Sequence, residues 1–276
     1  MKKLLLSAFV ICLAGTSIAQ ESPLWMRHCA LSPDGTTIAF TYKGDIYKVP
    51  STGGRATQIT TNPAFDTEPV WSPDSKQIAF ASDRMGSLDV FVVSSEGGAP
   101  QRLTTHSGSE KPVAYKDNKH ILFTANIAPS AEDAGFPSGQ FQQVYEVAVT
   151  GGRPAMFSSM PMECISINKE GVMLYQDKKG YEDYWRKHQV SPIARDIWTY
   201  TPGKKPVYQK QTTFGGEDRE PVWSPDGKSF YYLSEEKGSF NIFQRTPGTT
   251  TSQQITFHTK HPVRFLSIST TGTLCY

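Results

Sequence analysis

The sequence predicts an all-β protein: a six-bladed β-propeller of four-stranded antiparallel blades, with the sixth blade incomplete in this chain. Three observations predict this fold. A ten-residue pattern recurs six times, turn-forming residues flank each copy, and no stretch shows the period of an amphipathic helix. Many short strands at regular spacing with turn signals between them are typical of propeller blades.

Each copy of the pattern ends at an aromatic residue, and consecutive copies lie 40 to 57 residues apart. Three copies are close to one another: LSPDGTTIAF, WSPDSKQIAF and WSPDGKSFYY, ending at Phe40, Phe80 and Tyr232. Three are weaker: AYKDNKHILF, SINKEGVMLY and SISTTGTLCY, ending at Phe123, Tyr175 and Tyr276. The last copy holds only the start of a blade. We therefore expect five complete blades over residues 20–276 and a chain that is a fragment of a longer protein.

Each unit contains two hairpins. The Pro-Asp-Gly triplet separates a first strand such as 221–224 from a second such as 228–233, because Pro fixes φ, Asp bonds its own backbone and Gly accepts positive φ. In the second unit a third strand follows at 89–93, and Gly97-Gly98 turns the chain into 101–104. Asp34, Asp74 and Asp226 occupy the same turn slot, so we interpret them as turn formers and not as catalytic carboxylates.

Bulky aromatic residues at equivalent positions are expected to fill the core between blades, since one such sheet cannot bury both of its faces alone. They are Trp71, Trp223, Phe40, Phe80, Phe123, Tyr175, Tyr232, Phe91, Phe243 and Trp198.

The amino terminus has the features of a signal peptide. Lys2 and Lys3 precede an apolar run over 4–13, and Ser17-Ile18-Ala19 forms a small-x-small cleavage site, so residues 1–19 are expected to be removed. The run is too short for a permanent membrane span. The prediction is an exported protein, periplasmic or secreted; a lipoprotein anchor at Cys12 is the alternative.

The charge of the mature chain argues against nucleic acid as a partner. Removing residues 1–19 takes away two lysines and no acid, which leaves 26 basic residues against 26 acidic ones. Nucleic-acid binding depends on an excess of Lys and Arg. Neutral or peptide-like partners fit better.

Nothing in the sequence assembles a reaction centre. Cys29, Cys164 and Cys275 lack the spacing of a zinc site or a disulfide framework and are interpreted as small buried residues. His258 and His261 have no further ligands nearby in sequence, and no Gly-x-Ser-x-Gly motif occurs. We expect no catalytic residue, metal or cofactor in this chain.

Two insertions depart from the repeat. One spans 125–140 in the third unit and carries Glu132 and Asp133; the other spans 180–198 in the fourth. Long loops on a rigid scaffold often carry function, but these could equally cap the propeller or pack on a neighbouring domain.

The combination of LSPDGTTIAFTYKGDIYKVPSTGG, the LTT before the next blade and YEDYWRKHQVSPIARDIW resembles the amino-terminal propeller of the tricorn-like proteases over the whole mature chain. The resemblance implies a multidomain serine peptidase in which a second propeller, a PDZ-like domain and a catalytic core follow. The propeller would admit peptides or unfolded proteins and exclude folded ones. No position here matches the family's catalytic Ser and His. The sequence leaves open whether the protein forms a homo-oligomer.

Two other readings of the blades stay open. One is a TolB-like propeller that binds envelope proteins without catalysis. The other is the propeller of a dipeptidyl-peptidase or prolyl-oligopeptidase relative, whose core would be an α/β-hydrolase.

The position 12 residues before each terminal aromatic is ionisable in every copy. It precedes the first strand of each blade, which lies nearest the axis in propellers, so these side chains could ring one mouth of a channel. A ring of mixed sign could hold an extended peptide through charge-assisted hydrogen bonds. The alternative is ordinary loop residues or mutual pairing. The six residues are His28, Glu68, Lys111, Glu163, Glu220 and Arg264.

Overall fold

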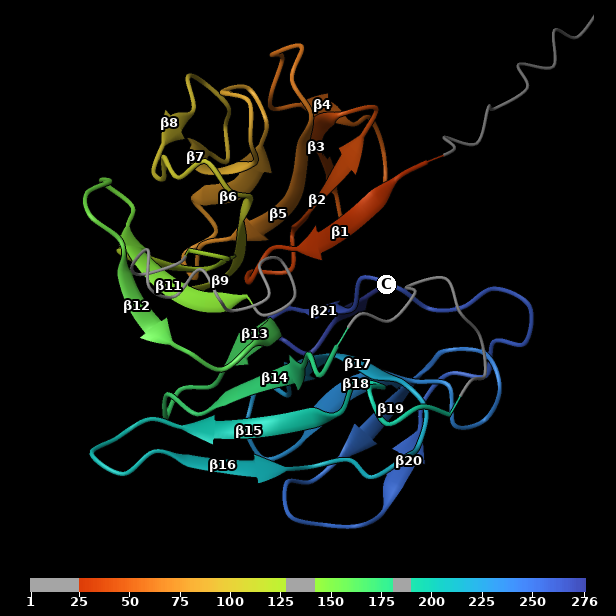
Figure 1. Cartoon of the computed structure of the whole chain (residues 1–276). Helices are drawn as coiled ribbons and strands as arrows, with labels where there is room; N and C mark the ends of the chain where they lie inside the picture. The colour runs from red at the N-terminus through yellow and green to blue at the C-terminus, as the bar shows by residue number, and fades with distance from the viewer. Residues whose placement is uncertain (1–24, 128–141, 181–189) are drawn as a thin grey trace, which may run out of the picture.

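The structure, a computed structural model, describes residues 25–127, 142–180 and 190–276 and is a β-propeller. Five four-stranded antiparallel sheets follow one another around the molecule, and a two-stranded sheet comes last (Figure 1). The expected signal peptide, Cys12, residues 128–140 of the first insertion and residues 181–189 of the second lie outside the described residues.

Each four-stranded sheet is one blade, with its strands in sequence order. Blade 1 consists of β1 (Arg27–Leu31), β2 (Thr37–Tyr42), β3 (Asp45–Pro50) and β4 (Thr57–Gln58). Blade 2 consists of β5 (Asp66–Trp71), β6 (Gln77–Ser82), β7 (Asp89–Ser94) and β8 (Gln101–Arg102). Blade 3 consists of β9 (Glu110–Asp117), β10 (His120–Ala125), β11 (Gln143–Ala148) and β12 (Ala155–Ser158).

The remaining sheets follow the same order. Blade 4 consists of β13 (Met162–Ile167), β14 (Met173–Asp177), β15 (Ile197–Thr201) and β16 (Val207–Lys210). Blade 5 consists of β17 (Asp218–Trp223), β18 (Phe230–Ser234), β19 (Asn241–Arg245) and β20 (Ser252–Gln254). The two-stranded sheet pairs β21 (Ser267–Ile268) with β22 (Leu274–Cys275).

The number of blades corrects the sequence prediction. The all-β propeller and its four-stranded antiparallel blades are confirmed, but the structure has five blades and not six. The sixth copy of the pattern makes only the sheet β21–β22, since the residues described after blade 5 form two short strands.

The aspartates of the repeated triplet are turn formers, as predicted. Asp34 Oδ1 accepts hydrogen bonds from the Ser32 hydroxyl at 2.6 Å and the Thr36 amide at 2.9 Å. Asp74 and Asp226 make the same pair of bonds in blades 2 and 5. These bonds lower the pKa of all three carboxyls. Each aspartate therefore closes its own hairpin.

The predicted aromatic core is confirmed between neighbouring blades. Phe80 of blade 2 is fully buried in a cluster with Ile46 of blade 1, and it stacks on Phe91 with ring centroids 5.9 Å apart. The indole of Trp71 donates a hydrogen bond to the Ala30 carbonyl of blade 1 at 2.9 Å. All ten predicted aromatics are buried except Trp198, which is half-buried. Apolar burial between sheets thus holds the blades together.

No helix in the described ranges is long and apolar enough to cross a membrane.

Candidate functional site

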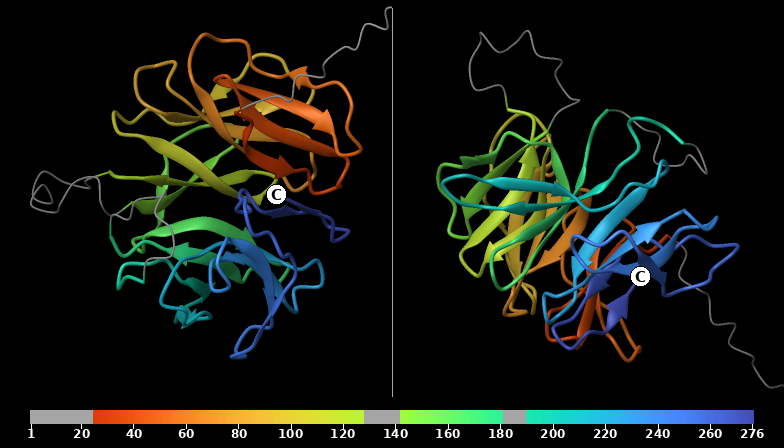
Figure 2. Two further views of the ribbon diagram at one scale, coloured as in Figure 1. Left: turned by 90° about the vertical axis from the view of Figure 1, so that its right-hand side faces the viewer. Right: turned by 90° about the horizontal axis from the view of Figure 1, so that it is seen from below.

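The first strands of the sheets surround a common axis. They contact one another in the closed order β1, β5, β9, β13, β17, β21 and back to β1. Figure 2 shows β1 beside the two-stranded sheet near the carboxyl end, where this circle closes. Side chains on these strands are therefore the ones that can meet in the middle of the molecule.

A bulge interrupts the first strand of each blade at the same place. In β1 the pairing with β2 skips two residues, and the first of these, His28, has a φ of 50°. The bulges of β5, β13 and β17 place Glu68, Cys164 and Glu220 at φ values of 56°, 50° and 50°. Positive φ is costly for residues other than glycine, and bulges re-aim side chains. The same costly backbone conformation therefore recurs at one position of these four strands.

Blade 3 and the last sheet show two variations on the bulge. Phe265, just before β21, has a φ of 59° and continues the series. In β9 the corresponding place is taken by Pro112, whose ring fixes φ at a negative value. Blade 3 therefore keeps the bulge but lacks the positive φ that the other first strands have there.

The six predicted ionisable residues occupy two adjacent positions and not one. His28, Glu68 and Glu220 lie at the first bulge residue. Lys111 and Glu163 pair with Thr124 and Gln176, and so lie one residue earlier. Arg264 likewise precedes Phe265.

The length of the first hairpin explains this offset. In blades 1, 2 and 5 the pairs that close the hairpin, such as Leu31 with Ile38, are seven residues apart. In blades 3 and 4 and the last sheet, the equivalent pairs, such as Ile167 with Met173, are six apart. These shorter hairpins are the copies without proline. Counting back 12 residues from the aromatic therefore overshoots by one in those three copies.

Most of the predicted residues bridge neighbouring first strands. Lys111 Nζ of blade 3 lies 2.6 Å from Glu68 Oε1 of blade 2. Glu220 Oε2 accepts the amide of Leu266 at 2.8 Å, next to the last sheet. His28 Nδ1 lies 3.1 Å from the Thr67 hydroxyl of blade 2. The ionisable side chains thus join one repeat to the next.

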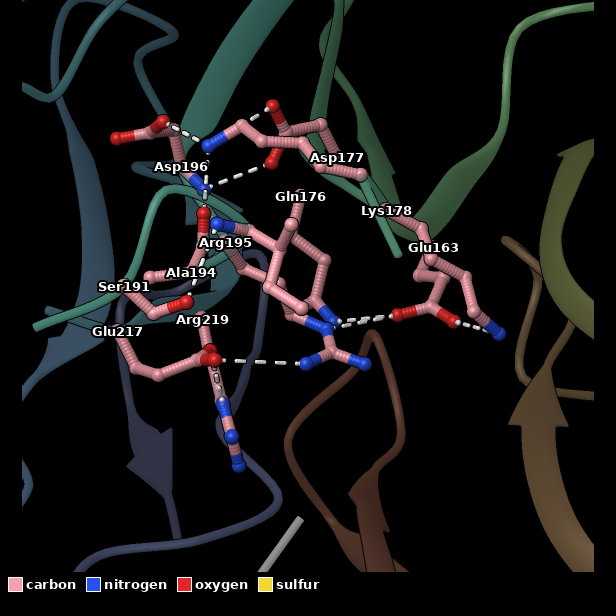
Figure 3. A network of polar contacts seen from close by, with 12 residues as sticks. Glu163, Gln176, Asp177, Lys178, Ser191, Ala194, Arg195, Asp196, Glu217 and Arg219 are labelled. Carbon is pink, nitrogen blue, oxygen red and sulfur yellow. Dashed lines mark hydrogen bonds and ion pairs between the residues drawn. The ribbon is translucent and has the colours of Figure 1, made fainter. Parts of the chain in front are cut away.

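Arg195, which sequence reasoning missed, joins blades 4 and 5 (Figure 3). Its Nε donates to Glu163 Oε2 at 3.1 Å, and its Nη1 lies 3.5 Å from Glu217 Oε1. Glu217 also accepts from Arg219 Nε at 2.7 Å. Arg195 belongs to the second predicted insertion, whose described end therefore packs on the propeller. Its only sequence signal was its place in that insertion.

A second ion-pair group anchors the same segment. Asp196, almost fully buried, accepts from Lys179 and lies 2.8 Å from Lys210 Nζ. Asp177 Oδ1 accepts the Asp196 amide at 2.8 Å, and Asp177 Oδ2 lies 3.5 Å from Lys179 Nζ. The segment before β15 is thus held by charges on both sides.

Burial shifts the pKa values of ionisable residues on the first strands. It lowers the pKa of His28 despite the opposing charge of Glu68, and it raises the pKa of Glu220. Burial also raises the pKa of Glu163, but Arg195 and Lys178 outweigh it, and the net pKa lies below the usual value. Two carboxyls of the same circle, Glu163 and Glu220, therefore differ in their affinity for protons.

Cys164 shows that charges from several blades act on one place. Its side chain is exposed, contrary to the predicted burial. Even so, desolvation by the surrounding protein raises the pKa of its thiol, and the carboxylates of Glu220, Glu163 and Glu68 add to the effect. These groups come from blades 5, 4 and 2. The circle of first strands thus encloses a region that water reaches and that several carboxylates share.

The hairpin turns after the first strands border a cavity of about 240 Å³. Its lining includes Pro33 of blade 1, Asn168 and Lys169 of blade 4, Asp226 of blade 5 and Thr270 of the last sheet. Polar and charged groups from turns far apart in sequence therefore meet at one end of the circle.

Comparison with known proteins identifies the family. Residues 23–276 match the family described as the tricorn protease N-terminal beta propeller domain. The chain belongs to this family. Tricorn protease homolog 1 of Streptomyces coelicolor is 39% identical over 213 residues, which cover 76% of this chain and 19% of that protein. The chain thus spans about a fifth of that tricorn relative.

Other similar proteins share the fold of this tricorn propeller. An uncharacterized protein of Agrobacterium fabrum is 34% identical over 218 residues, or 74% of this chain and 68% of that one. The crystal structure of the tricorn protease superposes with a TM-score of 0.72 at 16% identity, over 89% of this chain and 24% of that chain. A putative TolB from Agrobacterium tumefaciens gives 0.65 at 14% identity, over 84% and 81%.

Proposed function

We propose that this propeller is the substrate-access module of an exported tricorn-like serine peptidase, whose hydrolysis is done by other domains of the same polypeptide. The family match over residues 23–276 supports the parent protein, and the signal-like sequence at 1–19 supports export. The substrate would be a peptide or an unfolded protein. Downstream propeller, PDZ-like and catalytic domains would be its partners within the chain.

The single observation that carries the proposal is the closed circle of first strands with charges of both signs. Glu68, Lys111, Glu163 and Glu220 lie on it, and the charges of carboxylates from three blades act on the same water-accessible thiol. An extended peptide presents amide groups along its length and one charge at each end. Side chains of mixed sign can bind such groups without demanding a sequence, and the effect strengthens where protein excludes water.

The pairing of these charges refines the proposal. Because Glu68 is bound to Lys111, and Glu163 to Arg195, the ring is held in place by its own ion pairs. A peptide therefore meets a preorganised polar wall, and entry depends on its ability to exchange hydrogen bonds with that wall.

The test separates access from structure by a charge swap in the full-length peptidase. Glu68→Lys breaks the pair with Lys111 and reverses one charge, whereas Glu68→Lys with Lys111→Glu restores a pair in the opposite order. We expect both variants to change the ratio of cleavage rates for a long unfolded substrate against a dipeptide-sized one. If the swap restores the wild-type ratio, the pair is only a structural link and the access role is rejected. An unchanged ratio in both variants rejects it as well.

A TolB-like binding propeller without catalysis is the second candidate, supported by the superposition on 81% of the putative TolB chain. It predicts that the full-length protein binds an envelope protein and hydrolyses no peptide. Turnover of a fluorogenic peptide by the full-length protein, lost when its catalytic serine is replaced, decides for the peptidase.

A further inference from the structure

The sheet β21–β22 is bound to blade 1 by contacts between the two ends of the described chain. The Leu31 amide donates to the Ser267 hydroxyl at 3.0 Å, across 236 residues of sequence. The Thr270 amide and hydroxyl both donate to the Pro33 carbonyl at 2.8 Å. The same kind of bond joins blades 4 and 5, where the Trp223 amide donates to Ser166 Oγ at 3.1 Å. β21–β22 thus sits against β1 as one blade sits against the next.

Two cysteines meet at this junction. Cys29 lies in the bulge of β1, and its Sγ is 3.6 Å from the Phe265 carbonyl oxygen just before β21. Cys275 lies in β22 opposite Ser267, and its thiol is hydrogen-bonded to the Cys29 thiol. The backbones of β1 and β22 approach within 8 Å, Cα to Cα. Both thiols are reduced in the structure.

We propose that Cys29 and Cys275 form a disulfide bond that links β1 to β22 and closes the circle of first strands covalently. The two thiols lie on strands that contact each other and interact with one another, which is the proximity that a disulfide needs. Cys164, in the bulge of β13, is the third cysteine that the structure describes, so it is the matched control within the same protein.

The reaction needs a disulfide as oxidant, and oxidised glutathione represents this class. The Cys275 thiolate attacks one glutathione sulfur, which breaks the S–S bond, forms a mixed disulfide and releases one glutathione thiolate. The Cys29 thiol then gives up its proton and attacks the Cys275 sulfur, releasing the second glutathione. The two protein thiols lose two electrons and two protons, and one oxidised glutathione becomes two reduced molecules.

The pKa values of the two thiols determine which cysteine attacks the oxidant first and which one resolves the mixed disulfide. The hydrogen bond from Cys29 lowers the pKa of Cys275 to about 7 and raises the pKa of Cys29. Because the thiolate is the attacking species, Cys275 is the first nucleophile and Cys29 the resolving one. An exported protein would meet an oxidising compartment in which such a bond persists.

The test uses the full chain, folded and equilibrated with excess oxidised glutathione. Free thiols are alkylated before non-reducing digestion, and peptides are identified by mass spectrometry. We expect a linked peptide joining Cys29 to Cys275, lighter by two hydrogen atoms than its reduced parts. The Tm of the oxidised protein should rise by about 5 to 10 °C and return on reduction, because the link constrains nearly the whole chain.

Single cysteine replacements serve as controls. Cys164→Ser should keep both the linked peptide and the Tm rise, whereas Cys29→Ser and Cys275→Ser should lose both. Mapping of the wild-type protein decides the outcome even where a variant does not fold. Recovery of Cys275 only as a glutathione adduct, or of both cysteines only as alkylated thiols, overturns the proposal. If the linked peptide forms but the Tm does not change, the disulfide does not stabilise the closed circle of first strands, and that part of the proposal is overturned.

Discussion

Blades 2 and 5 have nearly the same first strand and turn, DTEPVWSPDSK and DREPVWSPDGK, but surround one buried carboxylate differently. Asp66 and Asp218 occupy equivalent places, each paired with a serine at the end of the second strand. In blade 2, Arg84 Nη2 lies 2.9 Å from both oxygens of Asp66. In blade 5, Glu236 stands two residues after the equivalent serine, where Arg84 stands in blade 2.

The difference shows in the affinity of Asp218 for protons. Burial raises its pKa to about 7, and the nearby carboxylates of Asp196 and Glu236 add to the effect. Equivalent positions of two blades can therefore have the same backbone pairing and differently charged neighbours. A carboxylate that an arginine satisfies in one blade becomes a pH-sensitive group in another.

The largest expected effect is the loss of the arginine in blade 2. Arg84→Met leaves fully buried Asp66 without its ion-pair partner, and removes a guanidinium that stacks over Phe91 at 4.5 Å. We expect the free energy of unfolding to fall by about 3 to 5 kcal/mol, measured by urea denaturation. Glu236→Met in blade 5 is the matched control and should cost little. Equal losses in both variants would contradict the comparison.

The second prediction concerns pH. Because the pKa of Asp218 is raised in the folded chain, the folded state binds a proton that the unfolded state has lost. Its stabilising contribution is complete only below the unfolded pKa of about 3.9, falls steadily as pH rises towards 7 and is lost above that value. Asn cannot ionise, so Asp218→Asn should reduce the fall in unfolding free energy between pH 5 and pH 8 by about 2 kcal/mol.

Two variants sharpen this pH test. Glu236→Arg places a guanidinium where blade 2 has one, and should flatten the same pH dependence while keeping the carboxyl. Asp66→Asn should instead destabilise at both pH values, since it leaves Arg84 without its carboxylate. A pH profile of Asp218→Asn that follows the wild type would show that Asp218 is not the titrating group.

The smallest effect concerns how each blade meets its predecessor. Ser166 accepts the amide of Trp223 at the junction of blades 4 and 5, whereas Ala30 occupies the same position before Trp71 and has no hydroxyl. Ser166→Ala should cost about 1 kcal/mol in unfolding free energy. Ser267→Ala, which removes the acceptor of the Leu31 amide, should cost a similar amount. A much larger loss for Ser267 would show that its junction depends on more than one bond.

Local features of the fold could be predicted from the sequence because their causes are local. The turn role of Asp34, Asp74 and Asp226 follows from bonds to residues two positions away. The burial of Phe80 and Trp223 follows from their repeated place beside those turns.

The rest depends on contacts across the sequence or on small differences in loop length. The one-residue shortening of three hairpins moved Lys111, Glu163 and Arg264 off the expected position; the missing proline marks these turns in the sequence but does not give their length. Arg195 and the Cys29–Cys275 contact come from segments that only the closed arrangement brings together. The number of blades was wrong because counting motif copies does not count the strands that each copy can recruit.

The junction of β1 with β21–β22 has a consequence for the order of folding. The other contacts that close the circle of first strands join consecutive repeats, whereas this one joins segments 236 residues apart. Closing so long a loop costs more chain entropy, and contacts of high sequence separation form slowly. The five blades should therefore assemble one on another before this junction forms. Hydrogen exchange should accordingly show the Leu31 amide exposed longer during refolding than the Trp223 amide.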